Sequence, residues 1–535
     1  MLKRRCRRWT WVAAAAGLLL TAGVLLLVWN APDASLAGAV DLRIERAGKT
    51  LEGRRGTALR EGDRLAVGGA GWASIRYADG TTLELGPGAA AELGSTSAGK
   101  RLRLTAGRLS AEVTTQKLPM KLDAPHATAE VRGTGLGLAV TAAGSELWVR
   151  SGSVAFGGVE VAAGRRARAA EGRAVDVEPA GREALRRLGR EHLMLGIMSV
   201  LGETWVDEVR AQGARFDLRY QHLSWNWTSW NKDGGFVPLY LKECEKLGVI
   251  PVFSYYVLSR PPTSLAAAAA DEALMGRYFR DLLLFLRRAG ENGKPLVLHV
   301  EPGLWEDPAP ARVAVAATGL PELAGLDDTL SGFGRAFGIL RDRHAPNVLL
   351  AWHASRREGK SARSTADELR RSGAWDLLFT DVGDRDAGYR ESKGEAGAWW
   401  SEGDFEAFRR WASELHGETG LPLFVWRIPL GNRVMAACDN TPWHYMDNKA
   451  EYWLEGYPVN RRLAEWAAAG VAGFLFGGGT YDCKVHRDNA KDGATNPAPA
   501  PGNRGERSAF PDDDGGYLRL RAGAYYKAGP VPLPR

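Results

Sequence analysis

The feature that most constrains this 535-residue chain is a set of eight apolar runs in its C-terminal part. The runs begin near residues 193, 214, 248, 295, 347, 375, 422 and 471. Longer segments separate them, and several of these, such as 271–290, carry apolar residues three and four apart, the spacing of an amphipathic helix. Strands that alternate with helices eight times indicate a (β/α)8 barrel, or TIM barrel. We therefore predict a parallel barrel over residues 192–530.

The N-terminus predicts a membrane anchor. A basic cluster at residues 3–8 precedes residues 9–29, which carry no charge and are rich in Ala, Leu and Val. That length spans a bilayer as a helix, and the flanking Lys and Arg keep the N-terminal end in the cytoplasm. The alternative is a cleaved signal peptide, with a small-residue site at 37–39. Because the apolar run exceeds the usual signal core, we predict that residues 1–30 form a cytoplasmic stub and a single-pass inner-membrane signal anchor, with the remaining chain periplasmic or extracellular.

Residues 40–179 predict an all-β domain, which a linker at 180–191 joins to the barrel. Asp79-Gly80 lies between two segments that alternate apolar with polar residues, a strong hairpin signal. Glycines recur about every ten residues, as expected for short strands and tight turns. The chain is therefore predicted to be multidomain.

The all-β region resembles the FecR domain. The similarity covers residues 55–170 in the order of that family, and Arg132-Gly133-Thr134 matches the family's best-marked turn. The resemblance implies an extracytoplasmic β module that senses, scaffolds or binds.

Polar and aromatic residues gather at the predicted strand ends, where sites of parallel barrels collect. The candidates for substrate binding or catalysis are Asp217, Arg219, His222, Trp225, Tyr255, His299, Glu301, Trp305, His353, Asp381, Trp426 and Arg427. Carboxylates among indole rings suit carbohydrate, because sugar faces stack on the rings and the acids contact hydroxyl groups. The nineteen tryptophans of the chain favour the same interpretation, although several are expected to fill the core.

Glycoside cleavage requires two carboxyl groups. Glu301 is the predicted acid, because burial at an apolar strand end raises the pKa of a carboxyl group, and Asp381 is its predicted partner. The second region resembles glycoside hydrolase barrels, and residues 300–302 are similar to the Asn-Glu-Pro of strand four in the large retaining clan. Val300 replaces the Asn, however, and Trp426-Arg427 stands where that clan has its nucleophilic Glu. The prediction is a glycoside hydrolase acting on a polysaccharide or envelope glycan; the alternative is a degenerate barrel that binds glycan, signals or scaffolds without cutting.

Other functions find less support in the sequence. After the N-terminus no basic run interleaves with aromatics, which argues against a nucleic-acid partner. The sequence has no HxH or HExxH spacing and no phosphate loop, so we expect no metal and no cofactor. Cys438 and Cys483 fall in predicted loops at one end of the barrel, and an oxidising compartment would let them form a disulfide.

Overall fold

The structure is a computed structural model. It describes residues 34–94, 99–198, 215–224, 226–258, 263–305, 309–323, 326–357, 359–373, 375–382, 387–392, 394–429, 433, 447–477 and 517–534. The predicted membrane span at 9–29, Trp225, Cys438 and Cys483 lie outside these ranges. Within the described ranges no helix has the length and apolar character needed to cross a bilayer.

The N-terminal domain is one 15-stranded, mostly antiparallel sheet. Its strands are β1 (Ala34–Arg46), β2 (Lys49–Glu52), β3 (Ala58–Leu59), β4 (Arg64–Tyr77), β5 (Thr82–Leu85), β6 (Ala90–Leu93), β7 (Arg101–Glu112), β8 (Met120–Ala124), β9 (Ala127–Val131), β10 (Gly135–Thr141), β11 (Gly144–Val149), β12 (Ser153–Phe156), β13 (Val159–Ala162), β14 (Arg165–Ala169) and β15 (Asp176–Pro179). The predicted hairpin at Asp79-Gly80 joins β4 to β5, and Gly80 takes a φ of 89° there. The buried side chains of these strands form a core of their own. The all-β prediction is confirmed.

The C-terminal domain is a closed barrel of eight parallel strands. They are β16 (Met194–Met198), β17 (Leu218–Ser224), β18 (Ile250–Tyr256), β19 (Leu296–Val300), β20 (Val348–His353), β21 (Leu377–Asp381), β22 (Leu423–Ile428) and β23 (Val471–Phe476). The strands pair in chain order, and β23 pairs with β16 to close the ring. The predicted (β/α)8 barrel is therefore confirmed, with all eight strands where the apolar runs lie.

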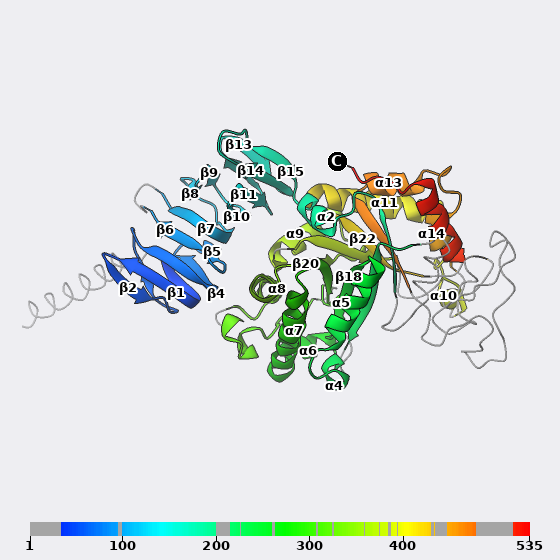
Figure 1. Ribbon diagram of the computed structural model, residues 1–535, viewed down its shortest axis with the longest axis horizontal. Coiled ribbons are helices and arrows are strands. Elements are labelled where there is room, and N and C mark those ends of the chain that lie inside the picture. The colour runs from blue at the N-terminus through cyan, green and yellow to red at the C-terminus, as the bar shows by residue number, and fades with distance from the viewer. Residues whose placement is uncertain are drawn as a thin grey trace, which may run out of the picture.

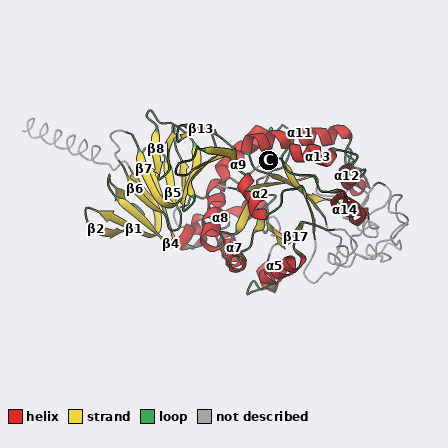
Figure 2. Cartoon of the chain, turned by 45° about the horizontal axis from the view of Figure 1, so that its top comes forward, coloured by secondary structure: helices red, strands yellow, loops and turns green. Residues whose placement is uncertain are grey.

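Helices surround the barrel strands (Figures 1 and 2). They are α4 (Trp227–Trp230), α5 (Phe236–Leu247), α6 (Leu265–Ala270), α7 (Glu272–Asn292), α8 (Leu330–His344), α9 (Ala362–Ser372), α10 (Ala387–Ser392), α11 (Glu402–Thr419), α12 (Lys449–Leu454), α13 (Arg462–Ala468) and α14 (Tyr517–Ala528). Local sequence sets their ends: a capping box of Ser401 and Asp404 begins α11, and Gly420 ends it with a φ of 67°.

Each barrel strand contributes to two apolar layers, because successive side chains point to opposite faces. On β19, Val297 joins the cluster inside the barrel, whereas Leu298 and Val300 pack outward against the helices. Such strands are buried on both faces, which explains why they read as continuous apolar runs.

The predicted linker at 180–191, whose composition is helical, contains a helix that packs against the barrel. Residues Arg182–Leu188 form α2, and its buried Ala184 and Leu188 pack against the interior cluster of the barrel. The helix precedes β16, so it closes the end of the barrel at which the strands begin.

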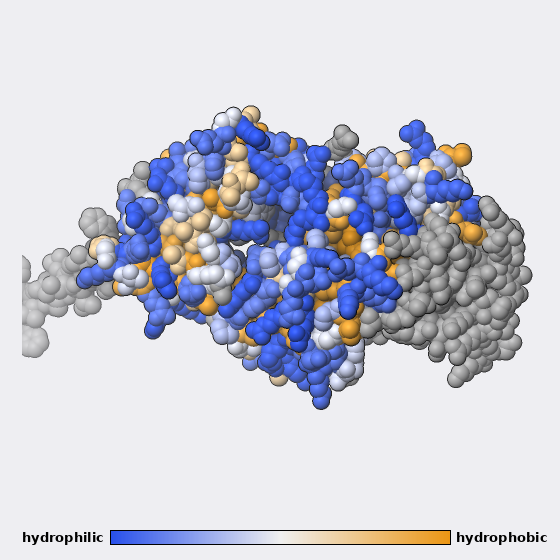
Figure 3. Space-filling view, viewed as in Figure 1, coloured by the Kyte–Doolittle hydropathy of each residue, from blue (hydrophilic) through white to orange (hydrophobic). Residues whose placement is uncertain are grey.

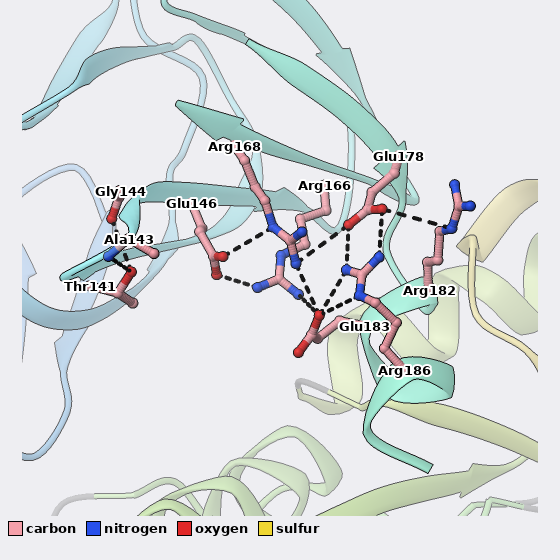
Figure 4. Close-up of polar contacts among 10 residues, drawn as sticks. All are labelled: Thr141, Ala143, Gly144, Glu146, Arg166, Arg168, Glu178, Arg182, Glu183 and Arg186. Atoms are coloured by element: carbon pink, nitrogen blue, oxygen red, sulfur yellow. Dashed lines mark hydrogen bonds and ion pairs between the residues drawn. The ribbon is translucent and has the colours of Figure 1, made fainter. Parts of the chain in front are cut away.

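The two domains meet along α2 and a neighbouring loop, and also where α8 faces β4 and β5, with an ion pair between Arg335 and Glu84. Figure 4 shows Arg186 bound to Glu178 at the end of the sheet and to Glu183 in α2, with Arg168 reaching both acids. The amide of Gly181 also donates to the carbonyl of Gly420, at 2.9 Å. Together these contacts hold the β domain against the barrel (Figure 1).

Candidate active site at the carboxyl end of the barrel

Glu301 follows the last residue of β19, but its side chain is enclosed. Its φ of 39° turns the backbone out of the strand, and the residue has 0% exposure. The carboxyl oxygen Oε1 accepts hydrogen bonds from the amides of Val257 (2.8 Å) and Leu258 (3.1 Å), just after β18. Burial raises the pKa of Glu301 to about 8, although the two amides act in the opposite direction.

The contacts of Glu301 indicate a structural role. Tyr278 of α7 belongs to the outer core layer beside it, and burial, then the nearby Glu301 carboxyl group, raises the pKa of that phenol well above its usual value. The carboxyl group therefore ties the loop after β18 to the end of β19. Its predicted role as the catalytic acid stays a prediction.

Asp381, the last residue of β21, does face the open end. Its side chain is 31% exposed, and its Oδ1 lies 3.8 Å from Nε2 of His353 at the end of β20. That separation is an electrostatic contact, longer than a hydrogen bond. Asp381 is thus the predicted acid that a ligand can reach in this structure.

Behind Asp381, a row of hydrogen-bonded side chains, formed by His353, His299 and Ser254, extends into the barrel. His353 Nδ1 lies 3.0 Å from His299 Nε2, and His299 Nδ1 lies 3.0 Å from the hydroxyl oxygen of Ser254. All three side chains are at most 1% exposed. Burial, followed by the charge of His353, lowers the pKa of His299 well below its usual value. Burial also lowers the pKa of His353, although Asp381 opposes that shift.

Trp426 of β22 organises the aromatic side of this site. Its ring meets His299 edge-on, with centroids 4.7 Å apart, and lies 5.7 Å from the ring of His222. The guanidinium of Arg427 lies 5.3 Å from the centre of the Trp426 ring. Arg427 takes a φ of 54°, in the left-handed region, and remains partly exposed, as does His222. The structure thus brings together five predicted residues around Trp426: His222, His299, His353, Asp381 and Arg427.

Two predicted residues at the start of β17 do not join them. Asp217 precedes the strand, so it lies at the opposite end of the barrel from Glu301, where it binds Arg190 and His192. Arg219 points outward to α5, pairs with Glu243 at 2.8 Å and is 0% exposed. The sequence predicts both at the ligand end, because a short polar-apolar alternation does not reveal where the strand begins or which face a residue takes.

Tyr255 and Trp305 also lie outside the predicted site. Tyr255 points away from the barrel interior and donates its hydroxyl hydrogen to the carbonyl of Tyr278. Trp305 is 8% exposed, donates to the carbonyl of Val300 and packs its ring 5.6 Å from that of Trp352. These rings fill the layer between barrel and helices instead of forming a stacking surface.

Ser254 is the site residue that the sequence analysis missed. It pairs in register with His299 across β18 and β19 and shares the inward face with Val252. Strand alternation from a correctly aligned Val252 would have found it. Among the residues that the structure describes, no three His, Cys, Asp or Glu side chains gather as a metal site requires. The visible face of the molecule is largely hydrophilic, with scattered apolar patches (Figure 3).

By its fold, the protein is a (β/α)8 barrel preceded by a β domain. Comparison with known families then identifies the β domain, because residues 63–155 match the family described as FecR protein. The chain therefore contains a FecR domain. A putative anti-sigma factor from Parabacteroides distasonis is similar in structure over 25% of this chain and 77% of its own, at 13% identity and a TM-score of 0.21.

Two solved barrels are similar to a larger share of the chain. An endo-β-1,4-mannanase from Cellulomonas fimi, a double mutant, covers 65% of this chain and 74% of its own, at 14% identity and a TM-score of 0.40. The catalytic domain of a glycoside hydrolase family 26 endo-β-1,4-mannanase from a Bacillus species covers 65% and 90%, at 12% identity and a TM-score of 0.38. No curated protein matches the chain. These similarities assign no activity to this barrel.

Proposed function

We propose that this protein is anchored in the inner membrane by residues 9–29 and binds a polysaccharide or envelope glycan at the carboxyl end of its barrel, without cutting it. The observation that supports binding is the arrangement of partly exposed Asp381, Arg427 and His222 around the buried Trp426. A carboxylate, a guanidinium and an imidazole together offer acceptors and donors to sugar hydroxyl groups. The FecR domain would then hold this end of the barrel in the periplasm or outside the cell.

The enclosed position of Glu301 argues against hydrolysis. Both carboxyl groups of a glycosidase must reach the scissile bond or its attacking water. Glu301 has no exposed surface, and its oxygens already accept from the amides of Val257 and Leu258. Of the two predicted acids, Asp381 is the one with exposed side-chain surface, and it supplies one of the two required groups.

Hydrolysis is nevertheless the second candidate, because one observation favours it. With a pKa of about 8, Glu301 holds its proton at neutral pH, as a general acid must. For this function the loop at Val257–Leu258 has to move away and expose the carboxyl group to the glycan beside Asp381.

A glycan panel separates the two functions. The full-length chain in detergent and its Glu301→Gln variant would be tested for binding to envelope glycans and plant polysaccharides, and the supernatants for new reducing ends. We expect binding without new reducing ends, and equal binding by the variant. Oligosaccharide release that Glu301→Gln abolishes would establish hydrolysis, whereas a wild-type chain that binds nothing on the panel would refute both functions.

A further inference from the structure

The buried row behind Asp381 contains two neutral imidazoles, and each therefore has one N–H donor and one acceptor nitrogen. Burial keeps both neutral, and the surrounding charges act in the same direction: His222 and Arg427 near His299, and Arg357 and Arg427 near His353. Among the residues that the structure describes, Asp381 acts in the opposite direction and raises the pKa of His353. Because the position of the proton on one ring fixes its position on the other, the hydrogen bonds along the row can run in only two directions.

In the first arrangement every bond donates toward the open end. The Ser254 hydroxyl donates to His299 Nδ1, His299 Nε2–H donates to His353 Nδ1, and His353 Nε2–H points at Asp381. In the second arrangement every proton is on the other partner, so His353 directs its Nε2 lone pair at the Asp381 carboxylate from 3.8 Å. A lone pair facing an anion is repelled, whereas an N–H facing it is attracted.

The packing around the row holds the rings in place for this arrangement. The His299 ring stacks on Phe379, with centroids 4.5 Å apart, and meets the edge of Trp426. The rings of His299 and His353 are themselves stacked at 5.1 Å. Neither imidazole can flip its ring nitrogens without losing a buried hydrogen bond.

We infer that Ser254, His299 and His353 form a one-way hydrogen-bond row that donates toward Asp381 and fixes its carboxylate as the acceptor for hydroxyl groups of a neutral glycan. This inference rests on the proposed glycan-binding function for its ligand, but the direction of the row does not depend on it. His353 and His299 are positioning residues, since they act on the ligand through Asp381. A sugar carboxylate placed at the same oxygen would be repelled, so uronic-acid glycans are excluded from this subsite.

Histidine NMR tests the row directly and needs no ligand. The full-length chain in detergent, labelled with 15N only in its nine histidines, would give a nitrogen spectrum near neutral pH, with His299→Gln and His353→Gln assigning the two rings. We expect both to carry the proton on Nε2. A proton on Nδ1 of either ring, or an imidazolium in the row, would overturn the inference even if the protein binds glycan.

Two substitutions of His353 test its effect on the ligand. In His353→Gln the side-chain amide keeps a donor toward Asp381, whereas His353→Leu removes it. Against neutral gluco- and manno-oligosaccharides and their uronic-acid counterparts, we expect His353→Leu to lose about tenfold or more in affinity for the neutral sugars, with most of this loss absent in His353→Gln. Equal losses in both variants, or tighter wild-type binding of the uronic acids, would contradict the inference. If no sugar binds the wild-type chain, the proposed function fails and the NMR result still decides the direction of the row.

Discussion

The enclosed carboxyl group of Glu301 makes a specific prediction about stability and pH. The folded protein keeps the Glu301 proton up to about pH 8, whereas an unfolded glutamate loses it near 4.5. Between these values the folded state binds more protons than the unfolded state, so the free energy of unfolding falls as pH rises. The slope approaches about 1.4 kcal/mol per pH unit, and the whole window amounts to about 5 kcal/mol.

Glu301→Gln removes this titration and keeps a carbonyl oxygen for the two amides of Val257 and Leu258. The variant should therefore gain stability relative to the wild type as the pH rises from 5.5 to 7.5. Two pH units correspond to about 3 kcal/mol, or a relative shift in Tm of about 4 °C for a barrel of about 340 residues. Thermal unfolding of the full-length proteins, followed by circular dichroism across this pH range, measures the shift.

Two controls interpret the Tm shift. Glu414→Gln makes the same substitution at an exposed glutamate of α11 and shows what the loss of a surface carboxyl group does to Tm. Glu301→Ala leaves two buried amides without acceptors and should lose about 1–3 kcal/mol for each at every pH. If the difference between Glu301→Gln and wild type stays constant from pH 5.5 to 7.5, Glu301 is ionised or exposed, and the structural role argued for it is wrong.

Three further predictions concern other parts of the chain. Asp217→Asn should cost about 3 kcal/mol, because it breaks a buried contact with Arg190 and His192, and should leave glycan affinity unchanged; reduced affinity would place Asp217 in the site after all. Gly420→Ala would set a Cβ 1.9 Å from the carbonyl oxygen of Gly164 at a φ of 67°, so limited proteolysis should cut faster between the domains, and unchanged cleavage would refute the tight junction. The disulfide predicted between Cys438 and Cys483 stays a prediction, and peptide mass mapping without reductant should find the linked pair rather than two thiols.

The barrel could be predicted from sequence because its strands are buried on both faces. Val471–Phe476 has no polar residue and Leu296–Val300 has only His299, and chain order alone sets their neighbours in a parallel barrel. The role of α2 could not be predicted in the same way. Its Arg-rich sequence is typical of an exposed connection. Ala184 and Leu188 are buried only because they cover the end of the barrel at which the strands begin, and the local sequence pattern does not show this contact.

The candidate site was predicted only in part, because strand-end position does not give side-chain direction. Asp381 and His353 continue the inward alternation of their strands, so their assignment to the mouth agrees with the structure. Glu301 would also continue the inward alternation of β19, but the left-handed φ at this residue redirects its side chain. Trp305 lies in the loop that follows β19, and its sequence position does not reveal that its ring packs against Trp352 in the layer between barrel and helices.

The central claim is that the barrel end around Asp381 binds a glycan that Glu301 does not cut. Calorimetric titration of the full-length chain with the tightest-binding oligosaccharide of the panel tests it most directly, with Asp381→Asn beside Asp367→Asn, a control in α9 that pairs only with Arg370 among its described contacts. The account predicts about a tenfold or greater loss of affinity for Asp381→Asn alone, with the oligosaccharide recovered intact. Unchanged affinity in Asp381→Asn, or an oligosaccharide recovered as fragments, would contradict it.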